Sequence, residues 1–381
     1  MRSYALAAAL AFASAARADV SPNVVPDAPP GSELAREAPE GLSTELHAYG
    51  RFAYTAVQTD PTVDFVGPTN GFRLPSARLE LDGSYGPKLH FRFSLDAARE
   101  DQPDPNSLNG VRRVALADAF AEVGTERLYA RVGQFKVPFN AEDLQSTATL
   151  KLAYRSVATR GVLLDEGYTE AGITLDRQLG VAVGGGLRAG DGRLSAEAAV
   201  FNGNGPDALV NSNDALAGAA RVAFTTKTLT VGVSAFAQQL TTMDRLDLRL
   251  NQLRLGASAD VLIEVGGLHV FAQALGQSTT ETTVADQATP ETTPPASLAG
   301  GAFVEVSYLL KSLGLEPAAR VEVYRPDSLQ QSHDLLYETL GVNWYLRDIP
   351  VKLVANVVLK QQKAERALKD NALILLAQAA F

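Results

Sequence analysis

Basic residues in one long segment are the side chains whose type and spacing best suggest a function. Lys151, Arg155 and Arg160 lie among small and apolar residues in Asn140–Gly167, which is bounded by predicted strands. A loop of this length in a compact protein usually has a function. If the loop folds into an aqueous lumen, these charges lower the barrier for anions and raise it for cations. If it lies outside, they are solvated surface charges, and their spacing leaves both alternatives open.

Patterns for catalysis or metal binding are weak. Each histidine lies in or beside a different predicted strand, and none has a serine motif nearby. Such isolated histidines are usually hydrogen-bonded wall residues rather than general bases. The chain has no cysteine, and no cluster of histidines or acids has the spacing of metal ligands. We therefore predict a protein that is not an enzyme and has neither metal nor cofactor. The histidines are His47, His90, His269 and His333.

Alternation of apolar and polar residues dominates the chain from about Thr44 onward and predicts strands with two unlike faces. In Leu89–Asp96, for example, Leu and Phe alternate with His, Arg, Ser and Asp. Short turns such as Tyr85-Gly86-Pro87 alternate with long polar segments such as Ser278–Ser297. Tight turns at one rim and long loops at the other are typical of a transmembrane barrel. No window beyond the first residues is apolar for long enough to form a transmembrane helix.

The strand segments number about sixteen, which predicts an all-β, antiparallel transmembrane β-barrel over residues 44–381. This number treats Tyr168–Ala189 as one strand, and a turn at Asp176-Arg177-Gln178 would make it odd. The alternation changes parity around Leu250–Leu255, which indicates a bulge or a misplaced strand end. Gly184-Gly185-Gly186 lies within a strand pattern, which favours a bend in the wall over a phosphate-binding loop. The predicted strands begin near Glu45, Gly71, Lys88, Arg112, Glu126, Tyr168, Arg193, Ala215, Thr228, Leu246, Leu268, Leu298, Glu316, Leu335, Pro350 and Asn371.

The polar face of the predicted strands carries charges of both signs, and this face points into the lumen because the other face meets lipid. Such a mixture favours paired wall charges over a track of one sign for anions. We expect Arg131 and Lys136 to join the three bases of the long segment at a constriction formed by residues 137–167. The lumen wall residues of interest are Arg51, Arg78, Arg92, Arg221, Arg320, Lys352, Asp118 and Glu122.

Both ends of the chain carry patterns typical of export and assembly. Residues 1–18 combine Arg2, an apolar run and Ala16-Arg17-Ala18, which predicts a Sec signal peptide. Residues 19–43 are rich in proline and predict an extended periplasmic tether. Alternating apolar residues end at Phe381, which is similar to the last strand that the outer-membrane barrel assembly machinery recognises. Loss of Arg2 and Arg17 takes the net charge from −9 to −11, so we expect no nucleic-acid partner.

The segment Leu128–Phe139 resembles the phosphate-selective porin O and P family. It contains Gly133-Gln134-Phe135-Lys136-Val137-Pro138-Phe139, which is similar to the signature of that family before its inward-folding loop. Asp118-Ala119-Phe120-Ala121-Glu122 and Phe201-Asn202-Gly203 also match in type and order. After the loop the family typically has Gly-Arg-Asp, whereas this chain has Asp165-Glu166-Gly167-Tyr168. A basic residue expected near the constriction is therefore missing.

The resemblance implies an outer-membrane porin, assembled as a homotrimer in outer-membrane lipid, through which small hydrophilic solutes diffuse passively. Anions, phosphate among them, are the solutes that it implies. A general, non-selective porin is the alternative within this class. A non-channel barrel, either an enzyme or an envelope-anchoring protein, is the alternative from another class. About sixteen strands leave an aqueous channel where eight would be filled by side chains, which favours the pore.

Overall fold

The structure is a computed structural model of the 381-residue chain. It describes residues 41–60, 70–99, 114–163, 166, 170–204, 211, 215–243, 249–283, 296–329, 334–363 and 368–381. The predicted signal peptide and all but the last residues of the predicted tether lie outside the described residues.

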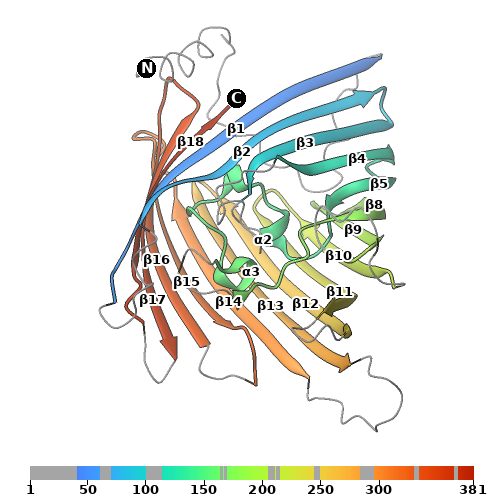
Figure 1. Cartoon of the computed structure of the whole chain (residues 1–381). Helices are drawn as coiled ribbons and strands as arrows, with labels where there is room; N and C mark the ends of the chain where they lie inside the picture. Colours follow the sequence, from blue (N-terminus) through green and yellow to red (C-terminus); the bar gives the residue numbers. More distant parts are fainter. Residues whose placement is uncertain are drawn as a thin grey trace, which may run out of the picture.

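Sixteen strands of the described chain form one closed antiparallel barrel (Figure 1). The strands follow one another around the wall in chain order, and the barrel closes where β1 pairs with β18, with Tyr54 opposite Leu375. Closure satisfies the main-chain hydrogen bonds that an open edge would leave unpaired in lipid. The strands are β1 (Leu42–Val57), β2 (Gly71–Tyr85), β3 (Leu89–Arg99), β4 (Ala115–Thr125), β5 (Leu128–Lys136), β8 (Arg177–Ala189), β9 (Gly192–Phe201), β10 (Ala217–Thr225), β11 (Leu229–Met243), β12 (Arg249–Val265), β13 (Leu268–Thr283), β14 (Ser297–Tyr308), β15 (Leu315–Arg325), β16 (Asp334–Tyr345), β17 (Val351–Lys363) and β18 (Ala372–Ala380).

The two faces of the wall differ in the way that the alternation predicts. Large apolar side chains are exposed on the outside, as at Leu46 (66% exposed) and Phe72 (73%). Charged side chains fill the inside, where Arg51 is 3% exposed and Glu122 is fully buried. An apolar outer face and a polar inner face are typical of a barrel that has lipid around it and a polar lumen.

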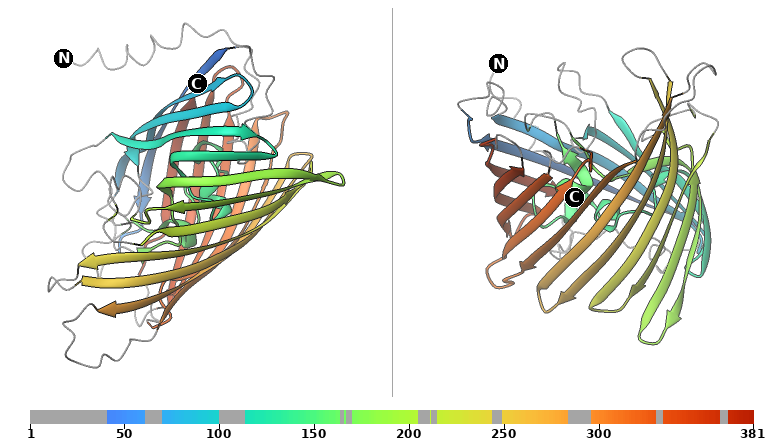
Figure 2. Two further views of the ribbon diagram at one scale, coloured as in Figure 1. Left: turned by 90° about the vertical axis from the view of Figure 1, so that its right-hand side faces the viewer. Right: turned by 90° about the horizontal axis from the view of Figure 1, so that it is seen from below.

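Within the described residues, the chain crosses the lumen once, between β5 and β8. This segment holds two short helices, α2 (Ala141–Leu144) and α3 (Val157–Arg160), and a 3-10 turn, η3 (Thr147–Thr149). It also holds β6 (Gly161–Val162) and β7 (Glu170–Ala171), which pair with each other apart from the barrel. Figure 2 shows these green elements surrounded by the strands of the wall when the barrel is viewed from below. We call Val137–Asp176 the inner loop.

The turns confirm the predicted difference between the two rims. At one rim the described connections are tight, such as Gly190-Asp191 between β8 and β9 and Gly266-Gly267 between β12 and β13. Both Gly190 and Gly266 have positive φ, at 60° and 63°, which a residue with a side chain rarely adopts. The connections at the opposite rim are longer. We call this opposite end of the barrel the long-loop end.

One detail of the predicted wall is wrong. Tyr168–Ala189 is not one strand: β8 begins at Arg177, directly after Asp176, whose φ is 46°, and the preceding residues belong to the inner loop. The strand number nevertheless stays even, because β7 pairs with β6 instead of joining the wall. Of the two explanations for the parity change near Leu250, a bulge is excluded, since β12 pairs with β11 in unbroken register from Arg249 to Ile263. The strand begins at Arg249 rather than near Leu246, in agreement with a misplaced strand end.

The three glycines of β8 do not interrupt the wall. The strand continues through them, paired with β9 up to Ala189. A side chain at Gly184 would collide with the Tyr129 ring, and one at Gly186 would collide with the Arg193 guanidinium. Glycine is needed here because these large side chains lie directly over the backbone of β8.

Among the described residues, no helix is long and apolar enough to span a membrane.

Candidate functional site

The inner loop is built from short turns that are capped by their own side chains. Asn140 accepts a hydrogen bond from the Asp143 amide at the start of α2 (3.2 Å). Ser146 does the same for η3, and Ser156 caps α3. Such caps satisfy amides that the first turn of a helix leaves unpaired. The segment can therefore fold compactly, although none of its helices exceeds four residues.

Apolar packing holds the inner loop against the wall. Phe139, Val157 and Ile173 are almost completely buried, in one cluster with wall residues. The rings of Phe139 and Phe236 on β11 meet edge to face, with their centroids 4.7 Å apart. Full burial of a large apolar side chain contributes about 1.5–3 kcal/mol, so the loop is a packed part of the barrel interior rather than a loose strap.

Wall side chains donate hydrogen bonds to the main-chain carbonyls of the inner loop. Lys352 Nζ on β17 donates to the Leu150 carbonyl (3.0 Å) and to the Ala148 carbonyl (3.2 Å). Arg320 on β15 donates to the Tyr154 carbonyl (3.0 Å), and Arg51 on β1 donates to the Ala153 carbonyl. These cations, which the sequence predicted on the lumen wall, bind the loop itself.

Wall oxygens complete the attachment by accepting hydrogen bonds from loop amides. Asn356 Oδ1 on β17 accepts from the Ala153 amide (2.7 Å), and Glu322 on β15 accepts from the Val157 amide (2.6 Å). Gln273 on β13 accepts from the Glu142 amide (3.0 Å). The inner loop is thus fixed to strands on the far side of the barrel from β5, so it crosses the lumen.

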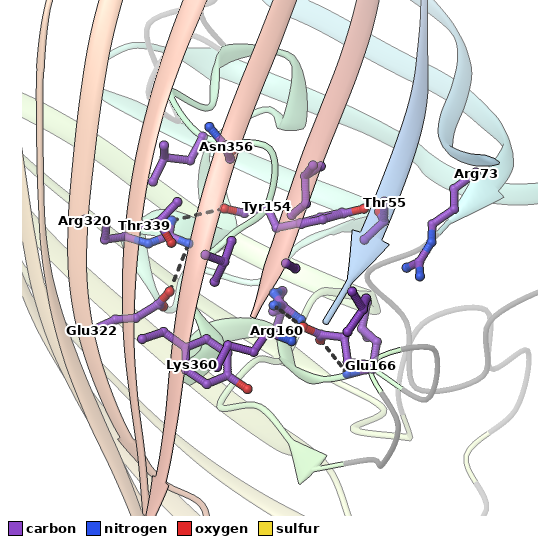
Figure 3. A pocket seen from close by; sticks show the side chains of 17 residues that line it. Thr55, Arg73, Tyr154, Arg160, Glu166, Arg320, Glu322, Thr339, Asn356 and Lys360 are labelled. Atoms are coloured by element: carbon purple, nitrogen blue, oxygen red, sulfur yellow. Dashed lines mark hydrogen bonds and ion pairs between the residues drawn. The ribbon is translucent and has the colours of Figure 1, made fainter. Parts of the chain in front are cut away.

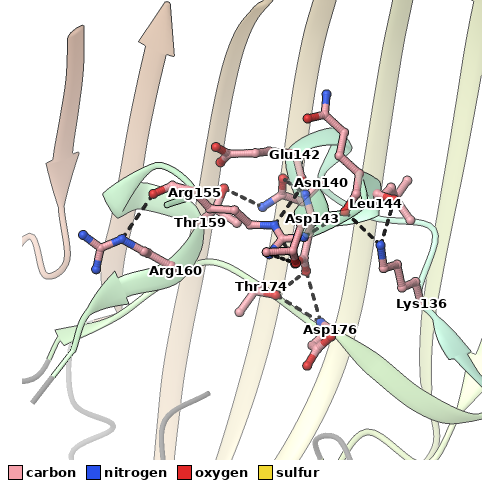
Figure 4. A network of polar contacts seen from close by, with 12 residues as sticks. Lys136, Asn140, Glu142, Asp143, Leu144, Arg155, Thr159, Arg160, Thr174 and Asp176 are labelled. Atoms are coloured by element: carbon pink, nitrogen blue, oxygen red, sulfur yellow. Dashed lines mark hydrogen bonds and ion pairs between the residues drawn. The ribbon is translucent and has the colours of Figure 1, made fainter. Parts of the chain in front are cut away.

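The bases predicted at the constriction all have partners. Lys136 Nζ donates to the Leu144 and Gln145 carbonyls (3.0 and 2.9 Å). Lys151 pairs with Glu316 (3.1 Å), and Arg160 pairs with Glu166 (2.5 Å). Figure 4 shows how Arg155 turns back into the loop, where its Nε donates to the Glu142 carbonyl (3.2 Å). The structure brings these bases together in the lumen, but as parts of a folded network.

Two carboxylates of the inner loop, Glu166 and Asp143, have pKa values that are shifted in opposite directions. Burial opposes ionisation of Glu166, but Arg160 and Lys360 outweigh it and hold its pKa well below the usual range. Lys360 on β17 lies 2.8 Å from Glu166, so this carboxylate ties the loop to the wall. Asp143 is also buried, and this burial together with the nearby Asp176 raises its pKa above the usual value.

The wall charges form opposite-sign pairs, as the mixed composition predicted. Arg131 lies between Glu122 and Glu197, at 2.6 and 3.1 Å. Further pairs include Arg78 with Asp96 (3.3 Å), Arg92 with Asp82 (2.7 Å), Arg177 with Asp118 (2.8 Å), Arg221 with Asp260 (2.6 Å) and Arg320 with Glu322 (3.3 Å). Pairing of this kind leaves little net field along the lumen axis.

One lumen arginine is different, and sequence reasoning missed it. Arg254 on β12 donates to the side-chain oxygens of Gln238 (3.3 Å) and Gln277 (2.5 Å), and it lies over the Phe236 ring. No carboxylate lies within ion-pair distance of it in the described chain. Arg254 lies between Leu253 and Leu255, which both point outward, so the alternation places Arg254 on the inner face. The change of parity nearby obscured this signal in the sequence. Arg177 was missed because it stood in a suspected turn.

The histidines and acids of the described chain make no metal site, since no group of three or more could hold an ion. His90 lies 3.5 Å from Asp82, and His269 lies 3.3 Å from Glu264, so both pair with wall acids. Ser84 lies opposite His90 and Ser307 lies opposite His269 on the neighbouring strands, and Ser307 Oγ donates to Glu316 (2.8 Å).

A closed barrel with an apolar exterior, a polar interior and a loop fixed across the lumen defines an outer-membrane porin. Comparison with protein families gives the particular family. The model of the phosphate-selective porin O and P family matches residues 46–261, more than half of the 381 residues. The chain therefore belongs to this family, in agreement with the resemblance of the segment ending at Phe139, and it is a channel of the outer membrane for small solutes.

Solved structures of porins share the fold. OmpF of Salmonella typhi, in complex with daunomycin, is 16% identical with a TM-score of 0.58, and the match covers 90% of this chain and 98% of that one. The anion-selective porin of Comamonas acidovorans is 13% identical with a TM-score of 0.55, covering 89% and 100%. The channel DcaP of Acinetobacter baumannii is 14% identical with a TM-score of 0.54, covering 90% and 98%. No curated protein sequence matches the chain.

Proposed function

We propose that the channel lets small hydrophilic solutes diffuse passively past the inner loop and selects mainly by size, with only weak preference for either sign of charge. The pairing of the inner-loop bases carries this proposal. Lys151 pairs with Glu316, Arg160 pairs with Glu166, and Arg155 Nε lies 3.9 Å from Asp143 Oδ1. A cation that is already paired attracts a passing anion much less than a free one.

The inner loop acts in this proposal as the element that sets the aperture. Its backbone is held on the far wall by Lys352, Arg320 and Asn356, so its position is fixed while solutes pass. Opposite charges on the wall, such as Arg92 and Asp82, give a field across the passage. Such a field orients dipolar solutes without excluding one sign of ion.

A preference for anions is the second candidate function, and Arg254 favours it. This guanidinium is bonded to neutral glutamine oxygens, so its charge is not cancelled by a described carboxylate. An uncompensated positive charge on the lumen wall lowers the energy of an anion near it. Phosphate transport by this chain would need more than this single group, because the loop bases are committed to the fold.

Topology in the cell follows from the same proposal. The long-loop end faces the exterior and the tight turns face the periplasm, after Sec export and cleavage of residues 1–18. Residues 19–43 form a periplasmic tether, and Phe381 serves the barrel assembly machinery. Exposed apolar side chains on the outer wall suit both lipid and a homotrimer interface.

Reversal potentials in a tenfold salt gradient across a planar bilayer test the selectivity. An ideally selective pore gives about 59 mV for monovalent ions, with a sign set by the permeant ion. We expect a potential far smaller than this limit. A value close to the anion limit would replace size selection by the anion-selective alternative, and a value close to the cation limit would contradict both candidates.

A further inference from the structure

Glu338 is a charged residue on the outer face of the barrel wall. The next residue along β16, Thr339, points inward, where it lines a small pocket between the wall and the inner loop (Figure 3). Side chains of a strand alternate between its two faces, so Glu338 points outward. The residues opposite it in the neighbouring strands are Val321 and Leu359, which are 52% and 39% exposed. The carboxylate therefore lies among apolar side chains on the surface that meets lipid.

The depth of Glu338 separates it from the other charges of the outer face. Trp344, six residues away on the same strand, is exposed near the tight turns, where aromatic residues mark the edge of the apolar band. Six residues of a strand tilted by about 40° rise about 15 Å, which is inside a band about 25 Å tall. The other outward charges that the structure describes in the strands stand at strand ends. They are Arg325, Asp334 and Lys363.

The Glu338 carboxylate has neither a hydrogen bond nor an ion pair within the described chain. Charged side chains on the lipid face of a barrel are destabilising, and the cost grows with depth. Ionisable groups at membrane depth normally have a partner for this reason. The partner of Glu338 has to come from another molecule that covers this part of the wall.

Tyr54 on β1 is a second polar group of the outer face. Its neighbour Thr55 lines the inner pocket, so Tyr54 points outward (Figure 3). The Tyr54 ring packs against Phe72 of β2, with centroids 5.0 Å apart, and its hydroxyl makes no hydrogen bond to a described residue. A hydroxyl in apolar surroundings without a partner costs free energy. The outer wall thus carries both a donor and an acceptor that lack partners.

Tyr54 and Glu338 lie at about the same depth. The strand register places Tyr54 in one row with Val342 of β16, four residues, or about 10 Å of depth, nearer to the tight turns than Glu338. Rows climb from β16 towards β1, since Trp344 at the end of β16 shares a row with Phe52, well inside β1. The climb over three strand spacings is also about 10 Å. The two groups are therefore level and roughly 18 Å apart, too far to meet within one chain.

Their spacing around the barrel fits a ring of three. β1 and β16 are three of the sixteen strand spacings apart, which is about 68° of the circumference. In a triangle of round barrels, the two lines of contact on each barrel lie about 60° apart, whereas a ring of four needs about 90°. Lines three strands apart are the ones that a trimer brings against its neighbours.

We propose that the outer face of β16–β18 and β1 is the contact between copies of this chain, and that Glu338 accepts a hydrogen bond from the partner's Tyr54. Each copy offers Glu338 to one neighbour and the Tyr54 hydroxyl to the other, so the ring closes. The contact removes both polar groups from lipid. It rests on the homotrimer of the proposed function, to which it adds the surface and the two residues.

Cysteine cross-linking of the full chain in isolated outer membranes tests the contact, because the chain has no cysteine of its own. Tyr54→Cys and Glu338→Cys in one chain cannot bond to each other, since a disulfide needs Cα atoms within about 7 Å. We expect oxidation to give covalent dimers and trimers. The matched control combines Glu338→Cys with Leu255→Cys, an outward position of β12, and should give monomers on a denaturing gel. Absence of cross-links in the first pair, or equal cross-linking of both pairs, would overturn the proposal.

Light scattering of the purified chain in mild detergent measures how much the hydrogen bond contributes. Glu338→Leu should raise the protein concentration at which the oligomer dissociates by about tenfold or more, as expected for loss of a hydrogen bond to a charged group. Glu338→Gln keeps an acceptor oxygen and should resemble the wild type. Unaltered dissociation of Glu338→Leu would show that the carboxylate faces lipid, which contradicts the proposal.

The same preparations separate this inference from the proposed function. A wild-type oligomer whose Tyr54→Cys, Glu338→Cys form gives no cross-link would sink the assigned interface alone. A monomeric wild type would sink the homotrimer and the interface together. Cross-linked oligomers that show no current in a planar bilayer would support the interface and sink passive diffusion alone.

Discussion

Lys352 Nζ lies 3.0 Å from the carbonyl oxygen of Leu150, although 202 residues separate them in the chain. The contact joins β17 to the inner loop across the barrel. Arg320 and Asn356 also form hydrogen bonds with the inner loop, so residues of the wall fix the position of the loop. If the inner loop sets the aperture as we propose, the pore size depends on the wall residues that hold the loop.

Replacing Lys352 by methionine should loosen the loop. The variant keeps the length of the side chain but leaves the Leu150 carbonyl without its donor, a loss of roughly 1–3 kcal/mol. In liposome swelling, we expect a larger increase in entry rate for a trisaccharide than for a pentose. Lys227→Met, in an exposed turn, is the control and should change neither rate. Equal rates for Lys352→Met and the wild type would refute this role.

Removal of Glu166 should expose the inner loop to protease. Glu166→Gln leaves Arg160 and Lys360 without their shared carboxylate, and breaking a buried pair typically costs about 3–5 kcal/mol. Trypsin should then cut after Arg155 or Arg160, which are protected in the wild type. Glu126→Gln, which unpairs the partly exposed Arg193 at the opposite rim, should leave the loop resistant. Full resistance of Glu166→Gln would mean that apolar packing alone holds the loop.

The pH dependence of this attachment follows from the lowered pKa of Glu166. A carboxyl group whose pKa is lower in the folded state than in the unfolded state stabilises the fold above its unfolded pKa, about 4.3. That stability is lost as the pH falls towards the folded value. We expect trypsin resistance of the loop to be unchanged between pH 8 and pH 6. A loss of resistance within that range would show that another group controls the loop.

We expect Arg254 to contribute more than the paired lumen residues to any preference of the channel for anions or cations. Arg254→Gln removes an uncompensated positive charge and should shift the reversal potential in a salt gradient towards cations. The matched control is the double variant Arg221→Gln with Asp260→Asn, which removes a charge pair and should cause little shift. If the two variants shift the potential equally, Arg254 has no special role.

Gly184 should be required for the packing of Tyr129. A methyl group in Gly184→Ala would collide with the Tyr129 ring, which lies over β8 and donates to Glu197. We expect a loss of about 1–3 kcal/mol, seen as a lower midpoint of thermal unfolding by circular dichroism. Gly276→Ala is the control, because a methyl group there has its nearest neighbour at an ordinary 3.6 Å. Equal midpoints in the two variants would contradict the packing argument.

The wall could be predicted from the sequence because its pattern is local. Each strand alternates on its own, as Leu89–Asp96 shows, and most predicted starts lie within a few residues of the observed ones. The exception is Tyr168, where alternation continues through residues that belong to the inner loop. Asp176, whose φ is 46°, separates the loop from β8, and the possible turn at Asp176-Arg177-Gln178 was the sequence signal for this boundary.

The site was less predictable because its partners are distant in sequence. The bases at Lys151, Arg155 and Arg160 could be identified, but not their bonds to Glu316, the loop carbonyls and Glu166. Those contacts depend on how the loop folds against strands that follow it by up to two hundred residues. Pairing of the wall charges could be predicted because the inner faces of the strands carry similar numbers of acids and bases.

The central claim is that this chain forms a diffusion channel whose aperture is set by an inner loop fixed to the wall. Single-channel recording of the wild type and of Lys352→Met in a planar bilayer tests it most directly. The account predicts discrete current steps for both proteins, larger and noisier in the variant. Absence of steps in the wild type, or identical steps in the two proteins, would contradict it.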